Sequence, residues 1–252
     1  MTIKPPAAPL LDHVTDWVFD LDNTLYPAEC DLFAEIDTRM TDFVARLTGL
    51  ERAEARKLQK HYYATYGTTL SGLMTEHGLD PAEFLHFVHE IDLSPLPDLP
   101  HLRSAIAALP GRKFIYTNGP RRHAERVTEK MGLAHLFTDS FGIEESAYTP
   151  KPHLPAYERF CRLHKVEPHG AAFFEDLARN LLPAKTLGFT TVLVQSAKDW
   201  SHEPIEARPA GAGDVFGGDG AGHIDYTTVD LAAFLDQAAP RPPAEPKDET
   251  DV

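Results

Sequence analysis

The sequence predicts an α/β fold, in which a three-layer, Rossmann-like parallel sheet forms the core and a helical cap domain is inserted into it. Two observations support this fold class. Short apolar segments alternate with longer segments of helical periodicity, which is typical of a parallel sheet covered by helices on both faces. One long stretch, residues 27–94, contains helical patterns only. With 42% hydrophobic and 25% charged residues, the composition is that of an ordinary globular chain.

Apolar segments mark the expected strands. The first, Trp17–Phe19, is short, flanked by polar residues and followed directly by Asp20, as expected for a buried strand. Similar segments lie at 113–117, 171–174 and 190–194, with a weaker one at 223–228. The helical patterns between and after them lie at 101–109, 121–131, 154–164, 177–187 and 229–238. Glycines stand near the helix-to-strand junctions, where helix C-caps favour them: Gly111, Gly132, Gly170 and Gly188.

The stretch after the first strand predicts the inserted cap. It contains helical patterns at 31–47, 52–66, 70–77 and 81–90, and it returns through the proline-rich segment 94–100, which suits a semi-rigid linker. We therefore expect a discontinuous core (1–26 and 95–238), a helical cap (27–94) and a disordered, proline-rich acidic tail (239–252). The glycine-rich segment 210–222 lacks the dinucleotide-binding fingerprint, so we interpret it as a surface loop.

Charge and cysteine usage narrow the function classes. The net charge of −14 argues against nucleic-acid or anionic-membrane partners, both of which need a basic surface. No apolar run reaches the ~18 residues of a membrane span, and residues 1–11 show no secretory signal. Cys30 and Cys161 are too few for a disulfide framework. These features predict a cytoplasmic protein with a small-molecule ligand, and they leave the oligomeric state open.

Polar residues stand at the ends of the predicted strands. Asp20 and Asp22 follow the first strand, Thr117 and Asn118 follow the second, and Lys151 opens a later helix. Ligands of open α/β sheets bind outside the carboxyl ends of the strands, so these residues are expected to converge. Each motif alone also fits turn or N-cap chemistry. Their coincidence at several strand ends favours a functional site instead.

A second acidic pair, Glu175 and Asp176, follows the segment 171–174, with Asn180 close behind. Carboxylate oxygens suit a hard cation such as Mg²⁺, and Asp20 and Asp176 are the expected ligands. Whether Glu175 or Asn180 also contacts the metal is left open at this point. A carboxylate beside a metal can attack phosphorus to form an aspartyl phosphate. We assign this attack to Asp20.

Three further residues complete the expected chemistry. Asp22 is the nearby carboxyl group that can protonate the leaving oxygen and later take a proton from water. The Lys151 ammonium and the Thr117 hydroxyl would stabilise the phosphoryl oxygens during transfer.

The order of four motifs, DLDNT at 20–24, TN at 117–118, KP at 151–152 and ED at 175–176, resembles the haloacid dehalogenase-like superfamily, in its phosphatase branch. The resemblance implies that Asp20 is the nucleophile and Asp22 the acid/base, with the Asp22 backbone carbonyl as a Mg²⁺ ligand. It implies further that Thr117, with the neighbouring Asn118, binds phosphate beside Lys151, and that Asp176 ligates the metal. The segment 27–94 is similar to the mobile cap of this superfamily.

A narrower resemblance, to pyrimidine 5′-nucleotidases, rests on the segments FDLDNTLYP (19–27), YGTTLSGL (66–73) and FFEDLARNLLPAKTLG (173–188). It implies a pyrimidine nucleoside 5′-monophosphate as substrate. We expect Tyr66 and Thr68 of the cap to contact the leaving group. The neighbouring Tyr62 and Tyr63 fit either core packing or stacking on a base.

Alternative functions use parts of the same pattern. A phosphatase or mutase acting on another small phosphomonoester, such as a sugar phosphate, fits the same site residues. A dehalogenase would not need Asp22, and a phospho-accepting signalling module would lack the large insertion. His86 and His89 stand three residues apart on one predicted helix and could share a zinc ion, but we interpret them as a solvent-exposed helix face.

Overall fold

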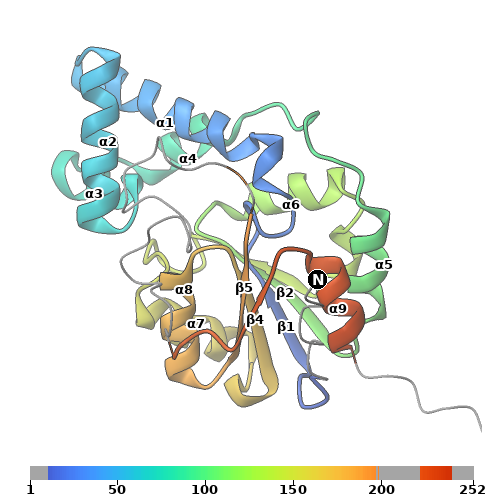
Figure 1. Cartoon of the computed structure of the whole chain (residues 1–252). Coiled ribbons are helices and arrows are strands. Elements are labelled where there is room, and N and C mark those ends of the chain that lie inside the picture. The colour runs from blue at the N-terminus through green and yellow to red at the C-terminus, as the bar shows by residue number, and fades with distance from the viewer. Residues whose placement is uncertain (1–10, 197, 199–221, 240–252) are drawn as a thin grey trace, which may run out of the picture.

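A computed structural model describes residues 11–196, 198 and 222–239 of the chain. Six parallel strands form one sheet in the order β3-β2-β1-β4-β5-β6 (Figure 1). The strands are β1 (Asp16–Phe19), β2 (Arg112–Tyr116), β3 (Asp139–Phe141), β4 (Ala171–Glu175), β5 (Thr190–Val194) and β6 (Tyr226–Thr228). This arrangement confirms the predicted fold class. Strand β3 was not anticipated, and β6 is shorter than the segment expected there.

Helices cover both faces of the sheet, which gives the three layers. They are α5 (Pro100–Ala108), α6 (Arg121–Lys130), α7 (Leu154–His164), α8 (Ala178–Leu187) and α9 (Leu231–Ala238). Buried side chains of α5, α6 and α9 share one hydrophobic cluster, and those of α7 and α8 share another. Single 3-10 turns are η1 (Ala28–Cys30), η2 (Ala134–Leu136) and η3 (Pro168–Gly170).

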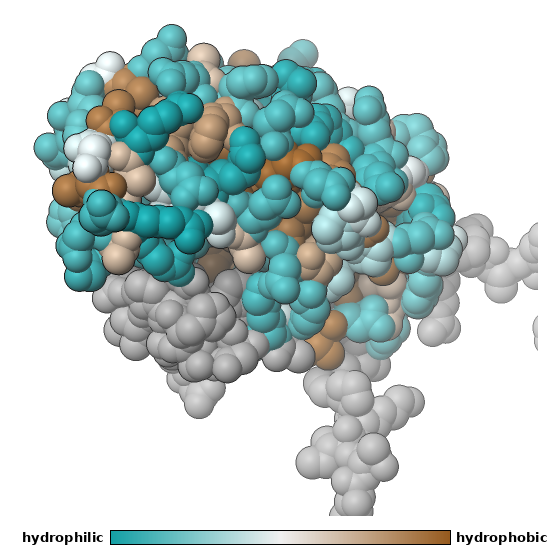
Figure 2. All heavy atoms as spheres, turned by 90° about the horizontal axis from the view of Figure 1, so that it is seen from above, coloured by the Kyte–Doolittle hydropathy of each residue, from teal (hydrophilic) through white to brown (hydrophobic). Residues whose placement is uncertain are grey.

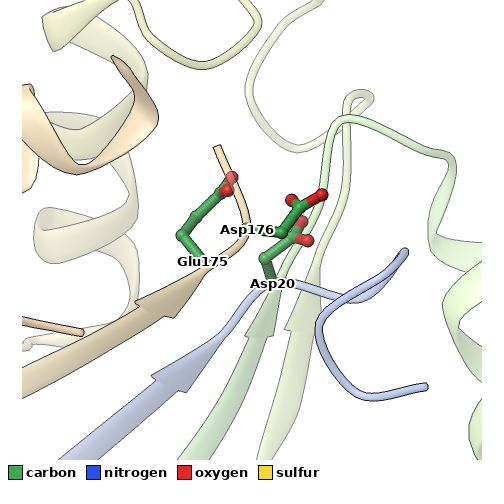
Figure 3. A group of neighbouring side chains, drawn as sticks. All are labelled: Asp20, Glu175 and Asp176. Carbon is green, nitrogen blue, oxygen red and sulfur yellow. The ribbon is translucent and has the colours of Figure 1, made fainter. Parts of the chain in front are cut away.

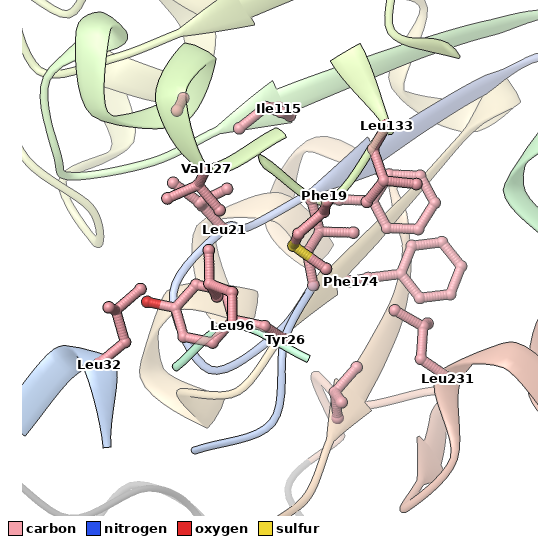
Figure 4. Packing of buried hydrophobic residues seen from close by; sticks show 14 of the residues in the cluster. Phe19, Leu21, Tyr26, Leu32, Leu96, Ile115, Val127, Leu133, Phe174 and Leu231 are labelled. Atoms are coloured by element: carbon pink, nitrogen blue, oxygen red, sulfur yellow. The ribbon is translucent and has the colours of Figure 1, made fainter. Parts of the chain in front are cut away.

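The alternation of side chains along the central strand explains the two clusters. Trp17 and Phe19 belong to the cluster on one face, and Val18 belongs to the cluster on the other. The Phe19 ring stacks on Phe174 of β4, with ring centroids 4.7 Å apart, and Figure 4 shows this part of the core. Burial on both faces fixes β1 at the centre of the sheet, so the residue that follows it is held firmly.

Four helices between β1 and α5 lie beyond the carboxyl edge of the sheet (Figure 1). They are α1 (Leu32–Thr48), α2 (Arg52–Tyr66), α3 (Thr69–His77) and α4 (Pro81–His89), and we call them the cap. The first three end at glycines in the left-handed conformation: Gly49, Gly67 and Gly78. The hydrophobic cluster of the β1 face continues into the cap through side chains such as Leu32 and Val88.

The end of the cap is tied to the core by Arg126 of α6. Its guanidinium donates hydrogen bonds to the backbone carbonyls of His89 (2.7 Å) and Ile91 (3.0 Å). Hydrophilic side chains cover most of the face seen in Figure 2, with smaller hydrophobic patches between them. In the described part of the chain, no helix combines the length and apolarity needed to cross a membrane. The predicted tail after Ala239 and the glycine-rich loop at 210–221 lie outside the described residues.

Candidate active site

The carboxyl ends of the three central strands meet at one cavity between the sheet and the cap. The cavity has a volume of about 360 Å³. Asp20 follows β1, Thr117 follows β2, and Glu175 is the last residue of β4. Because β2, β1 and β4 are neighbours in the sheet, residues far apart in the sequence line the same end of the cavity.

Lys151 lies at the centre of this group. Its ammonium donates to Asp20 Oδ1 (2.7 Å), to Glu175 Oε1 (2.8 Å) and to the Tyr116 carbonyl (2.9 Å). The Lys151 side chain is only 1% exposed, so these partners replace water almost completely. Burial alone would lower the pKa of Lys151, but the charges of Asp20 and Glu175 raise it above its ordinary value. The ammonium therefore stays charged and fixes one oxygen of Asp20.

Asp20, Glu175 and Asp176 form a buried acidic cluster whose ligand oxygens all lie within 4.8 Å of one another. Figure 3 shows the three side chains beyond the ends of the strands. Burial, partly offset by Lys151, raises the pKa of Asp20 to about 7. Burial and the charges of Glu175 and Asp20 also raise the pKa of Asp176 well above its ordinary value. Three carboxylates thus face one ammonium, which leaves the cluster short of positive charge.

A divalent cation fits this donor set. Its two charges would balance the two carboxylates that Lys151 leaves uncompensated, and carboxylate oxygens are the ligands that Mg²⁺ prefers. Glu175 already accepts hydrogen bonds from Lys151, Leu177 N and Asn180 Nδ2. Asp20 and Asp176 are therefore the carboxylates best suited to hold a metal. Asn180 Oδ1 is buried and has no hydrogen-bond partner among the described residues.

Asp22 also lines the cavity, but it contacts a different set of partners. Asp22 Oδ1 accepts a hydrogen bond from the Tyr26 hydroxyl (2.5 Å) and lies 2.8 Å from His123 Nε2. Burial alone would raise the pKa of Asp22, but His123 and the Tyr26 hydrogen bond outweigh it and lower the pKa. Asn23 has a φ of 63°, a conformation that asparagine tolerates, so the chain turns directly after Asp22.

Thr117 and Asn118 both line the cavity. The Thr117 hydroxyl accepts a hydrogen bond from Gly119 N (2.9 Å). The Asn118 side chain instead makes two hydrogen bonds to the backbone of Lys151: Nδ2 donates to the carbonyl (3.1 Å), and Oδ1 accepts from N–H (2.7 Å). Asn118 was predicted to bind substrate, but in this geometry its amide holds Lys151 in place.

The structure divides the predicted cap residues. Thr68 lines the cavity, although its hydroxyl also caps α3 by accepting from Ser71 N (3.0 Å). Tyr66 does not line the cavity, and its hydroxyl donates to Glu76. Tyr63, one turn earlier on α2, does line it, and the Arg179 guanidinium lies 5.0 Å from the Tyr63 ring centroid. The geometry therefore favours Tyr63 for the role predicted for Tyr66.

The two histidines of α4 differ from the expected solvent-exposed pair. His86 is exposed, but His89 is 8% exposed and its Nδ1 bonds the Leu85 carbonyl (2.9 Å). The His89 ring packs against His123, with centroids 4.8 Å apart. The interpretation as an exposed face was wrong for His89, because α4 turns this residue towards α6. Among the described residues, the only group of three possible metal ligands is the acidic cluster.

Sequence reasoning missed Tyr26 and His123, which bind Asp22, and Thr24, whose hydroxyl donates to Asp20 Oδ2 (3.0 Å). Tyr26 and Thr24 lie four residues from the aspartates that they contact, so the local spacing was a usable signal. His123 lies 101 residues from Asp22. The only signal for His123 was its place in the first turn of the helix after Thr117.

Curated proteins with similar sequences include a phosphate metabolism protein and two phosphoglycolate phosphatases. The chain is similar to Phosphate metabolism protein 8 of Saccharomyces cerevisiae (29% identity over 148 residues, 54% of this chain and 46% of that protein). It is also similar to the phosphoglycolate phosphatase of Mannheimia succiniciproducens (26% identity over 113 residues, 44% of this chain and 50% of that protein). The matched segment therefore spans about half the length of these curated relatives.

Solved structures share the fold. A HAD phosphatase from Thermococcus onnurineus matches with a TM-score of 0.53 and 19% identity, covering 85% of this chain and 93% of that chain. L-2-haloacid dehalogenase from Xanthobacter autotrophicus, with chloropropionic acid covalently bound, matches with a TM-score of 0.52 and 15% identity, covering 88% and 97%. A family model for haloacid dehalogenase-like hydrolases matches residues 18–188, more than half of the chain. The parallel sheet and the carboxylates at its edge agree with this match. The chain therefore belongs to the haloacid dehalogenase-like hydrolase family.

Proposed function

We propose that this protein is a Mg²⁺-dependent phosphomonoesterase that works through an aspartyl-phosphate intermediate on Asp20. One observation carries the proposal: a buried carboxylate, Asp20, stands in an acidic cluster beside a fixed ammonium, in the lining of a cavity of about 360 Å³. The phosphatase names of two curated relatives support the reaction type. Asp22, which a dehalogenase would not need, supports it further.

The proposed chemistry uses four residues that line the cavity: Asp20, Asp22, Thr117 and Lys151. Asp20 attacks phosphorus, the bond from phosphorus to the ester oxygen breaks, and Asp22 gives that oxygen its proton. Asp22 then takes a proton from the water that cleaves the aspartyl phosphate, which regenerates Asp20 and releases inorganic phosphate. Lys151 and Thr117 stabilise the phosphoryl oxygens in both steps.

Bound Mg²⁺, held by Asp20, Asp176 and the Asp22 carbonyl, would supply positive charge to the phosphoryl group. Glu175 then has a different role, because it shares Lys151 with Asp20 and holds the ammonium in place.

For the substrate we propose a pyrimidine nucleoside 5′-monophosphate. The cap side of the cavity combines a flat aromatic ring, Tyr63, with a set of hydrogen-bonding groups around Asp37. Asp37 accepts from Gln59 (2.6 Å), Arg56 (2.8 Å) and Lys60 (2.9 Å), and all four residues line the cavity. A ring stacked on Tyr63 with a polar edge towards these groups would match both features.

A second candidate substrate is 2-phosphoglycolate, the substrate named for two relatives. Its carboxylate would need a cationic partner at the cap side of the cavity. The observation that favours it is the presence of Arg56, Lys60 and Arg179 in the cavity lining. A sugar phosphate, or a mutase reaction on one, remains the broader alternative for the same site.

The test is a panel of phosphomonoesters with purified protein and Mg²⁺. It should contain UMP, CMP, AMP, GMP, 2-phosphoglycolate and a hexose phosphate, and it should measure kcat/KM by release of inorganic phosphate. We expect UMP and CMP to exceed AMP and GMP by about ten- to two-hundredfold, the range that a pocket edge typically gives. An isomeric phosphate ester, formed without release of inorganic phosphate, would indicate a mutase. No phosphate release from any ester would refute the phosphatase.

A further inference from the structure

Asp22 is held by two side chains that the reaction scheme above does not use. The Tyr26 hydroxyl (2.5 Å) and His123 Nε2 (2.8 Å) both contact Asp22 Oδ1. Within the described part of the chain, Asp22 Oδ2 makes no hydrogen bond. The two oxygens of this carboxyl group are therefore in different environments, one saturated with donors and the other available to the cavity that Asp22 lines.

The surroundings hold this arrangement rigidly. The His123 side chain is 0% exposed, and the Asp22 side chain is 13% exposed. The His89 ring covers His123 from the cap side, with centroids 4.8 Å apart. Tyr26 is 1% exposed and packs in the hydrophobic core, where Figure 4 shows it beside Leu32 and Leu96. Neither donor can turn away without disturbing packed neighbours.

We propose that His123 and Tyr26 are positioning residues that fix the rotation of the Asp22 carboxyl group, so that Oδ2 carries the proton delivered to the leaving oxygen. This inference rests on the proposed phosphatase function. Oδ1 already contacts both partners, so Oδ2 is the oxygen left to exchange a proton, and because the same partners favour the carboxylate form, their contribution is orientation. Preorganisation of this kind matters because a catalytic group displaced by about 1 Å can lose a hundredfold in rate.

The geometry also specifies which ring nitrogen of His123 holds the Asp22 carboxyl group. Nε2 faces Asp22, while Nδ1 is buried without a hydrogen-bond partner in the described residues. A glutamine side chain can place its amide nitrogen near the position of Nε2, whereas asparagine is too short to reach Asp22. His123→Gln should therefore keep the positioning hydrogen bond, and His123→Asn should lose it. The pair of variants separates a positioning role from a role that only an imidazole can fill.

The experiment compares two esters of similar size, benzyl phosphate and p-nitrophenyl phosphate. Benzyl alcohol is a poor leaving group and needs a proton, whereas p-nitrophenolate leaves without one. We would measure kcat and KM for both esters with the wild type, His123→Asn, His123→Gln and Tyr26→Phe. Tyr26→Phe removes only a hydroxyl and keeps the core packed, so it tests the inference even where a His123 variant folds poorly.

We expect His123→Asn and Tyr26→Phe to lower kcat/KM for benzyl phosphate by about ten- to a hundredfold, a part of what acid catalysis contributes. The ratio kcat/KM covers the steps up to departure of the alcohol and leaves out the later attack of water, which is common to both esters. The same variants should lower kcat/KM for p-nitrophenyl phosphate less than about threefold, and His123→Gln should stay within about threefold of the wild type on both esters. Crystal structures provide a readout independent of turnover: the Asp22 carboxyl group should be rotated in His123→Asn and unchanged in His123→Gln.

The matched control is His164→Gln. His164 is another largely buried histidine, with Nδ1 3.7 Å from the Asp139 carboxylate, but it lies on α7 away from the cavity. The His164→Gln substitution should leave the ratio of the kcat/KM values for the two esters unchanged. Equal losses in kcat/KM on both esters in His123→Asn and Tyr26→Phe, or a loss in His123→Gln as large as in His123→Asn, would overturn the positioning role. The wild type is assayed first on these two esters and on the panel above; if it hydrolyses none of them, the proposed function itself fails, and this result is visible before any variant is compared.

Discussion

The environment of Asp20 lowers the stability of the fold through charge repulsion, but it suits a proposed nucleophile. Its Oδ1 binds Lys151 and its Oδ2 binds Thr24, yet Glu175 and Asp176 stand close enough to repel its charge. A nucleophile needs its negative charge, and Lys151 alone does not restore the ordinary pKa of Asp20. Such uncompensated buried charge is typical of functional sites.

Replacing Asp20 by asparagine should abolish turnover without unfolding the protein. The amide cannot form the aspartyl phosphate, so we expect kcat to fall by about a thousandfold or more. Because the substitution removes repulsion with Glu175 and Asp176, the free energy of unfolding should not decrease. Phosphate release and urea unfolding measure the two quantities, with Asp98→Asn, an exposed residue, as the control. Near-normal phosphate release from the folded variant would show that the nucleophile is assigned incorrectly.

At the scale of elements, the geometry of helix α2 determines which tyrosine lines the cavity. Tyr63 lines the cavity and Tyr66 bonds Glu76, although the two lie on neighbouring parts of the same helical face. Tyr63→Ala should raise KM for the best nucleotide by about five- to a hundredfold, the value of one stacking contact, with little change in kcat. Tyr66→Ala is the matched control and should change KM less than about threefold. The opposite order would restore Tyr66 to the role that the sequence predicted.

Helix α4 carries a histidine whose burial makes the fold sensitive to acid. Burial lowers the pKa of His89 to about 3, whereas an unfolded histidine has a pKa of about 6.5. Between these values the unfolded state binds a proton that the folded state does not. The free energy of unfolding therefore decreases as the pH falls below about 6.5, by at most ~1.4 kcal/mol per pH unit from this group.

Urea unfolding at pH 7.5, 6.5 and 5.5 measures this dependence. The slope of stability with pH should be smaller in His89→Gln than in the wild type, and it should be unchanged in His86→Gln, the exposed neighbour on the same helix. Identical slopes in all three proteins would contradict the assignment of acid sensitivity to His89.

Most elements of this fold could be predicted because their patterns are local. Helix α2 (Arg52–Tyr66) and helix α7 (Leu154–His164) have the predicted bounds, since apolar periodicity and terminal residues mark them. Strand β3, Asp139–Phe141, was missed because three residues of mixed polarity carry no periodic signal. The site motifs at Asp20 and Asp176 were visible for the same local reason. The contact between His123 and Asp22 was not, because only tertiary packing brings together two residues that lie 101 positions apart.

At the scale of the whole molecule, a cation in the acidic cluster should link metal binding to folding. Mg²⁺ at a hundred times its Kd would add about 2.7 kcal/mol to the free energy of unfolding, which corresponds to a rise in Tm of roughly 5–10 °C for a chain of this size. Protons compete with the metal for Asp20, whose pKa is about 7. The rise in Tm should therefore be larger at pH 8 than at pH 6.

Thermal unfolding with Mg²⁺ and with a chelator tests this link without any substrate. Asp176→Asn should lose most of the rise in Tm, because it removes one of the two best-placed carboxylates. Asp98→Asn, on the surface, should keep all of it. An equal rise in both variants would place the bound metal elsewhere.

The central position of β1 also has a consequence for synthesis on the ribosome. The strand is translated first, but its neighbours β2 and β4 emerge only after the whole cap, and Lys151 follows Asp20 by 131 residues. The cap helices make mostly sequence-local contacts and can form while β1 still lacks both partners. A nascent chain stopped before residue 151 would hold Asp20 without its ammonium, so catalytic competence is acquired late in translation. A truncated product would therefore have an exposed central strand and no hydrolase activity.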